Sequence, residues 1–361
     1  MSAAVKAGNP PASPARDAGG TAPAGPARRA MNPTDANLDF VRAVAVLCVF
    51  CSHVWIIGTR QSSELLHHVG QLGVIMFFVH TSYVLMGSLE RSRLWGWPRV
   101  AEFFVHRAFR IYPLAIVCVL IAAALPGAAW TPRQLLANLT LTQDQFFEES
   151  MVGGLWTLPL ELQMYCALPF LFMALRRRPA WWAVGAWLLV LPLAQVRPEI
   201  SGRLLVLDYA PCFLPGLVAW RFGRHGVLPG WLWPPAVFLA ALPWVLSDGN
   251  QMAPRWITCV LLGLAIPWFG ELSTAWLRRA SHVVAKYSYG IYLTHVAALM
   301  VAFRSLEHLP LAVQLAAFAA MAVAFPCLAF HLVEQPMIAV GKRIGGRVAS
   351  VVAGRRQGVP A

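Results

Sequence analysis

Long apolar segments recur along this chain and restrict the folds that it can adopt. A helix rises about 1.5 Å per residue, so about 20 apolar residues are needed to cross the hydrocarbon core of a bilayer. Segments of this length, or close to it once tilt and flanking aromatic residues are allowed, predict an all-α integral membrane protein with about ten transmembrane helices. The sixth and eighth segments are short and also fit tilted or partly re-entrant helices. The ten segments are 38–57, 70–89, 103–125, 154–175, 181–196, 206–220, 228–246, 256–272, 286–304 and 311–333.

The small charged fraction agrees with a membrane protein and argues against a nucleic-acid partner. Only 12% of the 361 residues are charged, whereas a soluble domain carries about a quarter. The net charge of +13 is spread over arginines that lie between apolar segments and not on one basic face. Cys48 and Cys51 form a C-x-x-C, but Ser52 stands where haem attachment needs a histidine, and no further zinc ligands follow at suitable spacing. We therefore expect no metal and no permanently bound cofactor.

The distribution of basic residues predicts the orientation of the chain. With the N-terminus in the cytoplasm, 23 of the 29 Lys and Arg fall in inside segments, as the positive-inside rule requires. Both termini are then cytoplasmic. Residues 1–36, rich in Ala, Pro and Gly, predict a disordered cytoplasmic extension, within which Met31 is an alternative start. The membrane domain is expected at 37–336, followed by a basic cytoplasmic tail at 337–361 with no further domain.

The first apolar segment contains ionisable residues that are costly in a membrane. Arg42 and His53 return to nearly the same helix face, about 16 Å apart along the axis, and Asp39 precedes them. An ionisable side chain inside a membrane helix marks a functional site by default. The alternative is that Arg42 extends to the lipid headgroups while His53 bonds a neighbouring helix.

Glu161 lies near the start of the fourth apolar segment and is the expected partner of His53. If this helix begins at the outer surface, the Glu161 carboxylate lies about two turns inside, at a depth similar to that of His53. A buried carboxylate needs a partner or a proton. A carboxylate beside an imidazole sets its tautomer and raises its basicity, which suits a general base that accepts a proton from a hydroxyl.

Two arginines at the start of the third segment suggest an anion site. Arg107 and Arg110 are three residues apart and therefore on one side of the helix. Guanidinium groups bind phosphate oxygens in a bidentate manner, so together with Arg42 they would suit a phosphorylated donor such as coenzyme A. The alternative is that they serve as positive-inside anchors.

Two late pairs and one loop allow more than one interpretation. Tyr292 and His295, and likewise His331 and Glu334, are three residues apart, so each pair could satisfy itself across a helix turn. The acidic outer loop at 126–153 fits a lid or acceptor-binding segment as well as an ordinary solvated loop.

Six segments in this order resemble the membrane acyltransferase 3 family of bacterial envelope O-acyltransferases. They are LDFVRAVAVLCVFCSH, GVIMFFVHTSY, HRAFRIYP, LWTLPLELQMY, YSYGIYLTH and VEQP, and the resemblance covers about residues 37–340. It implies that Arg42 and His53 form an essential pair and that Arg107 and Arg110 form a second one. The chain departs from the family pattern at His80 to Tyr83, where a Ser-Gly-aromatic step is usual.

The resemblance implies an O-acyltransferase in the bacterial inner membrane. The donor would be cytoplasmic acetyl-CoA or another acyl-CoA, and the acceptor a hydroxyl of an envelope glycan or lipid-linked saccharide. His53 and Glu161 would be catalytic, with His53 either activating the acceptor directly or carrying the acyl group. Supporting or acceptor-site candidates are Asp39, His80, Tyr165, Tyr292, His295 and Glu334. The alternative is a transporter or flippase, although the repeat symmetry typical of transporters is not apparent.

Overall fold

The computed structural model describes residues 35–357 apart from 62, 126–127, 201–202, 204 and 249–250. Over these residues the protein is built from helices and contains no β-strand, so the predicted all-α class is confirmed. The helices are α1 (Ala36–Thr59), α2 (Glu64–Arg91), α3 (Trp97–Ala123), α4 (Pro132–Thr140), α5 (Gln143–Phe146), α6 (Leu158–Leu175), α7 (Trp181–Ile200), α8 (Val206–Phe222), α9 (Trp233–Val245), α10 (Met252–Ala265), α11 (Ala275–Met300), α12 (Leu311–Leu328) and α13 (Gln335–Gln357). Short 3₁₀ turns, η1 (Leu155–Thr157) and η2 (Gly230–Leu232), and π-helical turns, η3 (Val301–Ser305) and η4 (Ala329–Glu334), join some of them.

Each of the ten predicted segments contains an α-helix, and the helices differ in length. In the described part of the chain, five helical segments are long and apolar enough to cross a membrane: Ala36–Thr59, Glu64–Arg91, Trp97–Ala123, Leu155–Leu175 and Leu311–Val348. Three shorter apolar helices lie at Trp181–Val196, Gly230–Val245 and Met252–Ala265. The total of ten spans and the cytoplasmic position of both termini therefore stay predictions.

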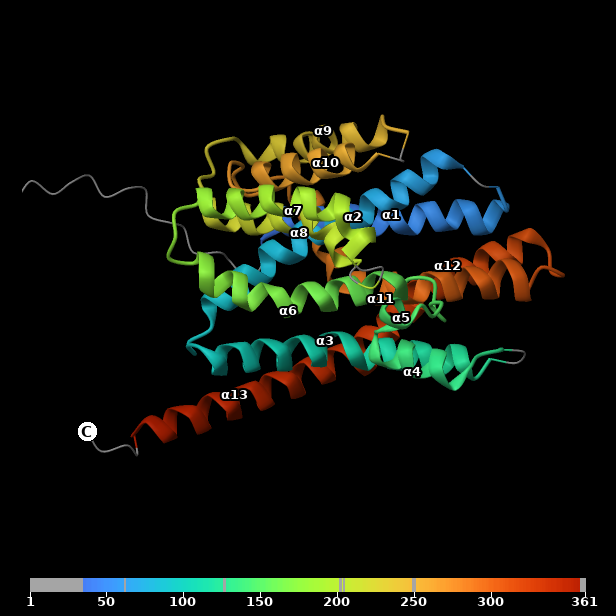
Figure 1. The fold of residues 1–361 in the computed structure, drawn as a ribbon. Helices are drawn as coiled ribbons and strands as arrows, with labels where there is room; N and C mark the ends of the chain where they lie inside the picture. Colours follow the sequence, from blue (N-terminus) through green and yellow to red (C-terminus); the bar gives the residue numbers. More distant parts are fainter. Residues whose placement is uncertain are drawn as a thin grey trace, which may run out of the picture.

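The helices form a bundle (Figure 1), with a buried centre and large apolar side chains on its exterior. Of the apolar window of α2, 78% is buried, whereas only 6% is buried in the window of Leu311–Val348. Large apolar side chains are exposed on the outer helices, among them Leu189, Leu239 and Leu328. Large exposed apolar surfaces mark interaction with membranes or other proteins, so the outer helices suit contact with lipid.

α1 packs against both α2 and α11. Its first turn is capped by Asp35, whose carboxylate accepts a hydrogen bond from the backbone of Asn37 and forms an ion pair with Arg224. Residues 1–34, which make up most of the expected disordered extension at 1–36 and include Met31, lie outside the described residues. Asp35 and Ala36 already belong to the start of α1.

Most of the segment predicted as a basic cytoplasmic tail at 337–361 forms the helix α13. It continues from η4 and packs along α3 at one side of the bundle (Figure 1). Two glycines in one helical face permit the close approach: a Cβ at Gly341 would lie 2.7 Å from Phe109 Cβ, and one at Gly345 would lie 2.6 Å from His106 Nε2. Glycines spaced four residues apart allow such close helix packing in membranes. The first residues of the expected tail therefore belong to the packed bundle.

Candidate active site

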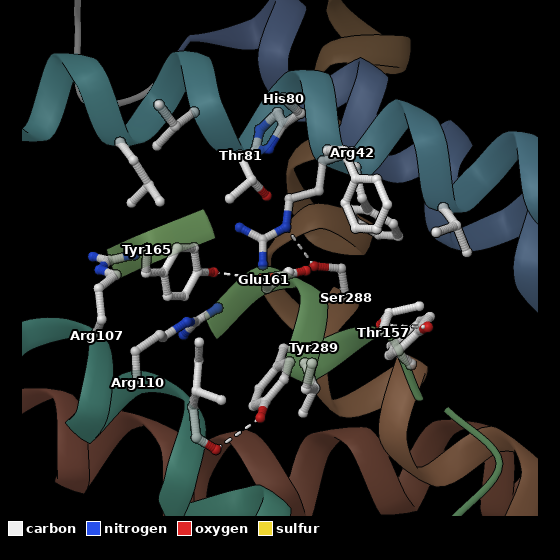
Figure 2. Close-up of a pocket in the computed structure, with 18 residues that line it drawn as sticks. Arg42, His80, Thr81, Arg107, Arg110, Thr157, Glu161, Tyr165, Ser288 and Tyr289 are labelled. Atoms are coloured by element: carbon white, nitrogen blue, oxygen red, sulfur yellow. Dashed lines mark hydrogen bonds between the residues drawn. The ribbon is translucent and has the colours of Figure 1, made fainter. Parts of the chain in front are cut away.

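Helices α1, α2, α3, α6 and α11, together with η1, line a partly open cavity with an interior of about 110 Å³ (Figure 2). A cavity of about 150 Å³ can hold one benzene molecule, so the interior takes one small group such as a phosphate, and a longer ligand would extend out through the open side. Its polar wall is unusual for the interior of an apolar bundle. The polar lining residues are Arg42, His80, Thr81, Arg107, Arg110, Thr157, Glu161, Tyr165, Ser288, Tyr289 and Tyr292.

The two arginines of α3 both line the cavity, as their spacing of three residues predicts. They differ in their partners. Arg110 forms an ion pair with Glu334 of η4, at 3.0 Å between Arg110 NH1 and Glu334 Oε2. Arg107 has a buried Nε that finds no hydrogen-bond partner among the described residues. The Nε–H of Arg107 is therefore available to a ligand.

Arg42 reaches the cavity from the first half of α1. Its Nε donates a hydrogen bond of 2.6 Å to Ser288 Oγ, and that hydroxyl donates to the carbonyl of Ala285 at 2.9 Å. Figure 2 shows the Arg42 side chain extending from α1 toward Glu161. A guanidinium has five N–H donors, so the bond to Ser288 leaves Arg42 able to bind an anion.

Glu161 lies in the first turn of α6, where the positive end of the helix dipole favours a carboxylate. Its carboxylate accepts a short hydrogen bond from the hydroxyl of Tyr165, one turn further along the same helix. Tyr289 also lines the cavity, and its hydroxyl donates a hydrogen bond of 2.7 Å to the carbonyl oxygen of Ile111 in α3.

The ionised forms of these groups leave the site with a formal charge of +1. Arg42, Arg107 and Arg110 carry three positive charges, and Glu161 and Glu334 carry two negative charges. Buried charges are costly unless they are paired, so one uncompensated guanidinium favours an anionic ligand. Arginine is the residue best suited to bind phosphate in this way.

His53 lies farther along α1 and is not one of the residues that line this cavity. Its Nδ1 is 3.0 Å from Nε2 of His295 in α11. Nδ1 of His295 is in turn 2.9 Å from the carbonyl oxygen of Ile291. The cavity and the histidines are connected through α11, because Tyr292 lines the cavity and its ring centroid is 6.3 Å from that of His295.

The expected pairing of His53 with Glu161 is wrong. The structure gives His53 a histidine partner and gives Glu161 a tyrosine partner. The depth argument failed because α6 does not begin at the surface. Leu155 of η1 is 0% exposed, and a Cβ on the preceding Gly154 would lie only 2.6 Å from the carbonyl oxygen of Tyr292. The chain enters the bundle before α6 starts, and Glu161 therefore shares a cavity with Arg42.

The predicted self-satisfied pairs are replaced by contacts between helices. Tyr292 bonds Thr157 at 2.9 Å between the two hydroxyl oxygens, and His295 bonds His53. Glu334 pairs with Arg110, while His331 Nε2 lies 3.2 Å from the hydroxyl of Tyr287. Local spacing places such residues on one helix face but leaves the choice of partner to helix packing.

Of two further candidates, His80 lines the cavity and Asp39 does not. Asp39 pairs with His282 of α11, at 2.8 Å between Asp39 Oδ2 and His282 Nδ1, and is not part of the cavity wall. His80 is buried and lines the cavity beside Thr81. The next residue, Ser82, donates a short hydrogen bond to the carbonyl of Phe213 in α8. The segment that departs from the family pattern thus contributes both to the cavity wall and to helix packing.

Sequence reasoning did not propose four of the polar lining residues as site residues, namely Thr81, Thr157, Ser288 and Tyr289. The signal was present, since each lies within a segment that carries the family resemblance: GVIMFFVHTSY, LWTLPLELQMY or YSYGIYLTH. Among the described residues, no group of three or more His, Cys, Asp or Glu side chains is placed to hold a metal ion.

Comparison with known proteins defines the class of this site. A family model described as an acyltransferase domain matches residues 35–331. The chain belongs to this acyltransferase family and is an acyltransferase.

Two curated relatives carry related descriptions. The chain is 26% identical over 310 residues to Acyltransferase MdmB of Streptomyces mycarofaciens, which covers 72% of this chain and 77% of that protein. It is 27% identical over 374 residues to Nodulation protein 10 of Rhizobium leguminosarum bv. viciae, covering 87% and 96% of the two chains. No solved structure matches the chain.

Proposed function

We propose that the protein is a membrane-embedded O-acyltransferase that moves an acetyl group from cytoplasmic acetyl-CoA to a hydroxyl of a cell-envelope saccharide. The observation that carries this proposal is the polar cavity, in which Arg42, Arg107 and Arg110 outnumber the two carboxylates near them. A buried site with surplus guanidinium charge favours a phosphorylated ligand, and acyl-CoA is a phosphorylated acyl donor.

The separation between the arginines and His53 agrees with the shape of this donor. Arg42 and His53 are about 16 Å apart along α1. The arm of coenzyme A between its diphosphate and its sulfur is comparable to about four extended residues, or roughly 14 Å. Phosphate oxygens bound near Arg42 and Arg107 would thus leave the thioester near His53.

His53 has two chemically complete roles in this proposal. As a general base, it accepts the proton of the acceptor hydroxyl while the oxygen attacks the thioester carbon; the C–S bond then breaks and the thiolate leaves with that proton. As a nucleophile, Nε2 of His53 attacks the thioester carbon, the C–S bond breaks and the thiolate leaves an acyl-imidazolium; the acceptor hydroxyl then attacks the acyl carbon, the C–N bond breaks, and the hydroxyl proton passes to the freed Nε2 and from there to the thiolate. The second route lets the acyl group advance through the membrane before the acceptor binds.

The proposed setting is the bacterial inner membrane, with ten spans and both termini in the cytoplasm. The uneven distribution of Lys and Arg supports this orientation, and the exposed apolar side chains of the outer helices support contact with lipid. In this orientation Arg107 and Arg110 lie toward the cytoplasmic supply of donor, whereas His53 lies toward the outer side.

The test uses the full chain in lipid nanodiscs with acetyl-CoA labelled in the acetyl group. We expect the wild-type protein to release free coenzyme A thiol and to transfer the labelled acetyl group. We expect His53→Ala to lose both activities. Mass analysis of envelope glycans from cells with and without the protein then identifies the acetylated saccharide. A protein that moves a saccharide across the bilayer without consuming acetyl-CoA would contradict the proposal and favour the transporter alternative.

A further inference from the structure

A chain of two hydrogen bonds runs from the backbone of α11 to the side chain of His53. The carbonyl oxygen of Ile291 lies 2.9 Å from His295 Nδ1, and His295 Nε2 lies 3.0 Å from His53 Nδ1. His295 is 2% exposed, and its ring packs 6.1 Å from the ring of Phe50, measured between centroids. The position of each proton in these two hydrogen bonds follows from the carbonyl oxygen of Ile291.

A carbonyl oxygen can only accept a hydrogen bond, so Nδ1 of His295 carries a proton. A neutral imidazole has one N–H, which makes Nε2 of His295 an acceptor. The facing Nδ1 of His53 must then be the donor. Neutral His53 consequently has its proton on Nδ1 and an unprotonated Nε2, which holds the lone pair that a base or nucleophile needs.

The surroundings favour the neutral form of His295 that this assignment requires. Phe50 stacks on Phe318 with ring centroids 5.8 Å apart, and Tyr292 contributes a ring on the α11 side. The ionisable group bonded to His295 is His53 itself. A charged imidazole in this apolar, enclosed position would be costly.

We propose that His295 is the positioning residue of His53: it selects the tautomer with the proton on Nδ1 and holds the ring so that Nε2 is available for acyl transfer. The inference rests on the proposed function, since it assigns the orientation of the group that performs the transfer. A carboxylate orients the histidine in the serine protease triad. Here a neutral imidazole does so, which avoids the cost of a buried carboxylate in the membrane.

The arrangement also serves the step after proton uptake. When Nε2 of His53 accepts a proton, its Nδ1–H becomes part of an imidazolium and donates a stronger, charge-assisted hydrogen bond to His295 Nε2. The pair therefore stabilises the charge that develops on His53 without a second ionised group.

Substitutions at His295 separate orientation from simple packing. His295→Gln keeps an amide oxygen near the position of Nε2, so it retains an acceptor for His53. His295→Asn keeps an amide group near Nδ1 but is too short to reach His53. His295→Phe keeps the ring volume and removes both polar atoms. His331→Asn changes an exposed histidine of η4 and serves as the matched control.

We expect kcat to fall by about a hundredfold or more in His295→Asn and His295→Phe, to recover substantially in His295→Gln, and to be unchanged in His331→Asn. The KM for acetyl-CoA should change little in all four variants, because the donor phosphates bind elsewhere. A purely structural role would instead make His295→Phe the best tolerated substitution, and that order would overturn the inference.

The tautomer itself is measured by ¹⁵N NMR of protein labelled at the histidine rings, with the His53 signals assigned by comparison with His53→Ala. The wild-type protein should show a protonated Nδ1 and an unprotonated Nε2 on His53, and His295→Asn should lose this preference. A protonated Nε2 in the wild type would overturn the inference whatever the activity. Failure of the proposed function is distinct from this: a wild-type protein without acetyl-CoA turnover but with the expected tautomer would refute acyl transfer and leave the hydrogen-bond assignment standing.

Discussion

Arg110 of α3 and Glu334 of η4 form an ion pair of 3.0 Å beside the polar cavity. The Glu334 side chain is 0% exposed and that of Arg110 is 21% exposed, so the pair is shielded from water. It joins α3 to the turn that leads into α13. Because Glu334 pairs with Arg110, we propose different tasks for the two arginines of the R-x-x-R motif: Arg110 ties helices together, and Arg107 binds the donor.

Glu334→Gln should destabilise the protein by about 3–5 kcal/mol, because it leaves a buried guanidinium without its partner. The measurement is the free energy of unfolding in detergent. The double variant Arg110→Met with Glu334→Leu removes both charges and should recover much of the loss. Equal stability of the single and double variants would show that the ion pair does not explain the effect.

Arg107→Lys should weaken acetyl-CoA binding by roughly tenfold or more, since Lys keeps the charge but lacks the planar fork worth about 1.5–3 kcal/mol at a phosphate. Arg110→Lys should have the smaller effect on donor affinity, because Arg110 is already paired. Both variants should insert normally because their charge is retained. Donor affinity is measured by calorimetry or as KM; unchanged values in both would favour the anchoring interpretation.

His53→Ala should abolish acyl transfer and leave expression and insertion intact, since Ala is easier to place in a membrane helix than an imidazole. The measurements are transfer from labelled acetyl-CoA and the amount of folded protein in the membrane. Near-normal transfer by this variant would remove His53 from the mechanism.

The orientation predicts opposite labelling of two surface positions in a cysteine-free background. Glu149→Cys lies in the exposed segment before η1 and should react with an impermeant thiol reagent added to the periplasm. Arg177→Cys lies in the exposed link between α6 and α7 and should not react. The reverse pattern would mean that the number of spans is wrong.

Asp144 in α5 should make stability depend on pH. Burial raises the pKa of its carboxyl to about 6, and Oδ2 finds no hydrogen-bond partner among the described residues. A raised pKa in the folded state means that the protonated form stabilises the fold; this contribution is complete below the unfolded pKa of about 3.9 and is lost as pH rises through about 6. Asp144→Asn should therefore raise the unfolding temperature at pH 8 but not at pH 4. An equal shift at both pH values would assign the effect to packing.

The sequence by itself determined the helices and their ionisable faces. Each of the ten apolar segments contains an α-helix, because hydropathy is a local property of the sequence. Arg107 and Arg110 both line the cavity because a spacing of three residues places them on one helix face. Six short segments in order were also enough to identify the acyltransferase family.

Only the tertiary structure decided which side chains meet. His53 pairs with His295, Arg42 with Ser288 and Arg110 with Glu334, and each pair joins helices far apart in the sequence. Such contacts depend on which helices are neighbours and on how deeply each begins. Glu161 is the clearest case. Because η1 is buried, α6 begins inside the bundle, and the Glu161 carboxylate lies in the cavity with Arg42 and not beside His53. Spacing along one helix specifies a face, whereas packing between helices specifies the partner.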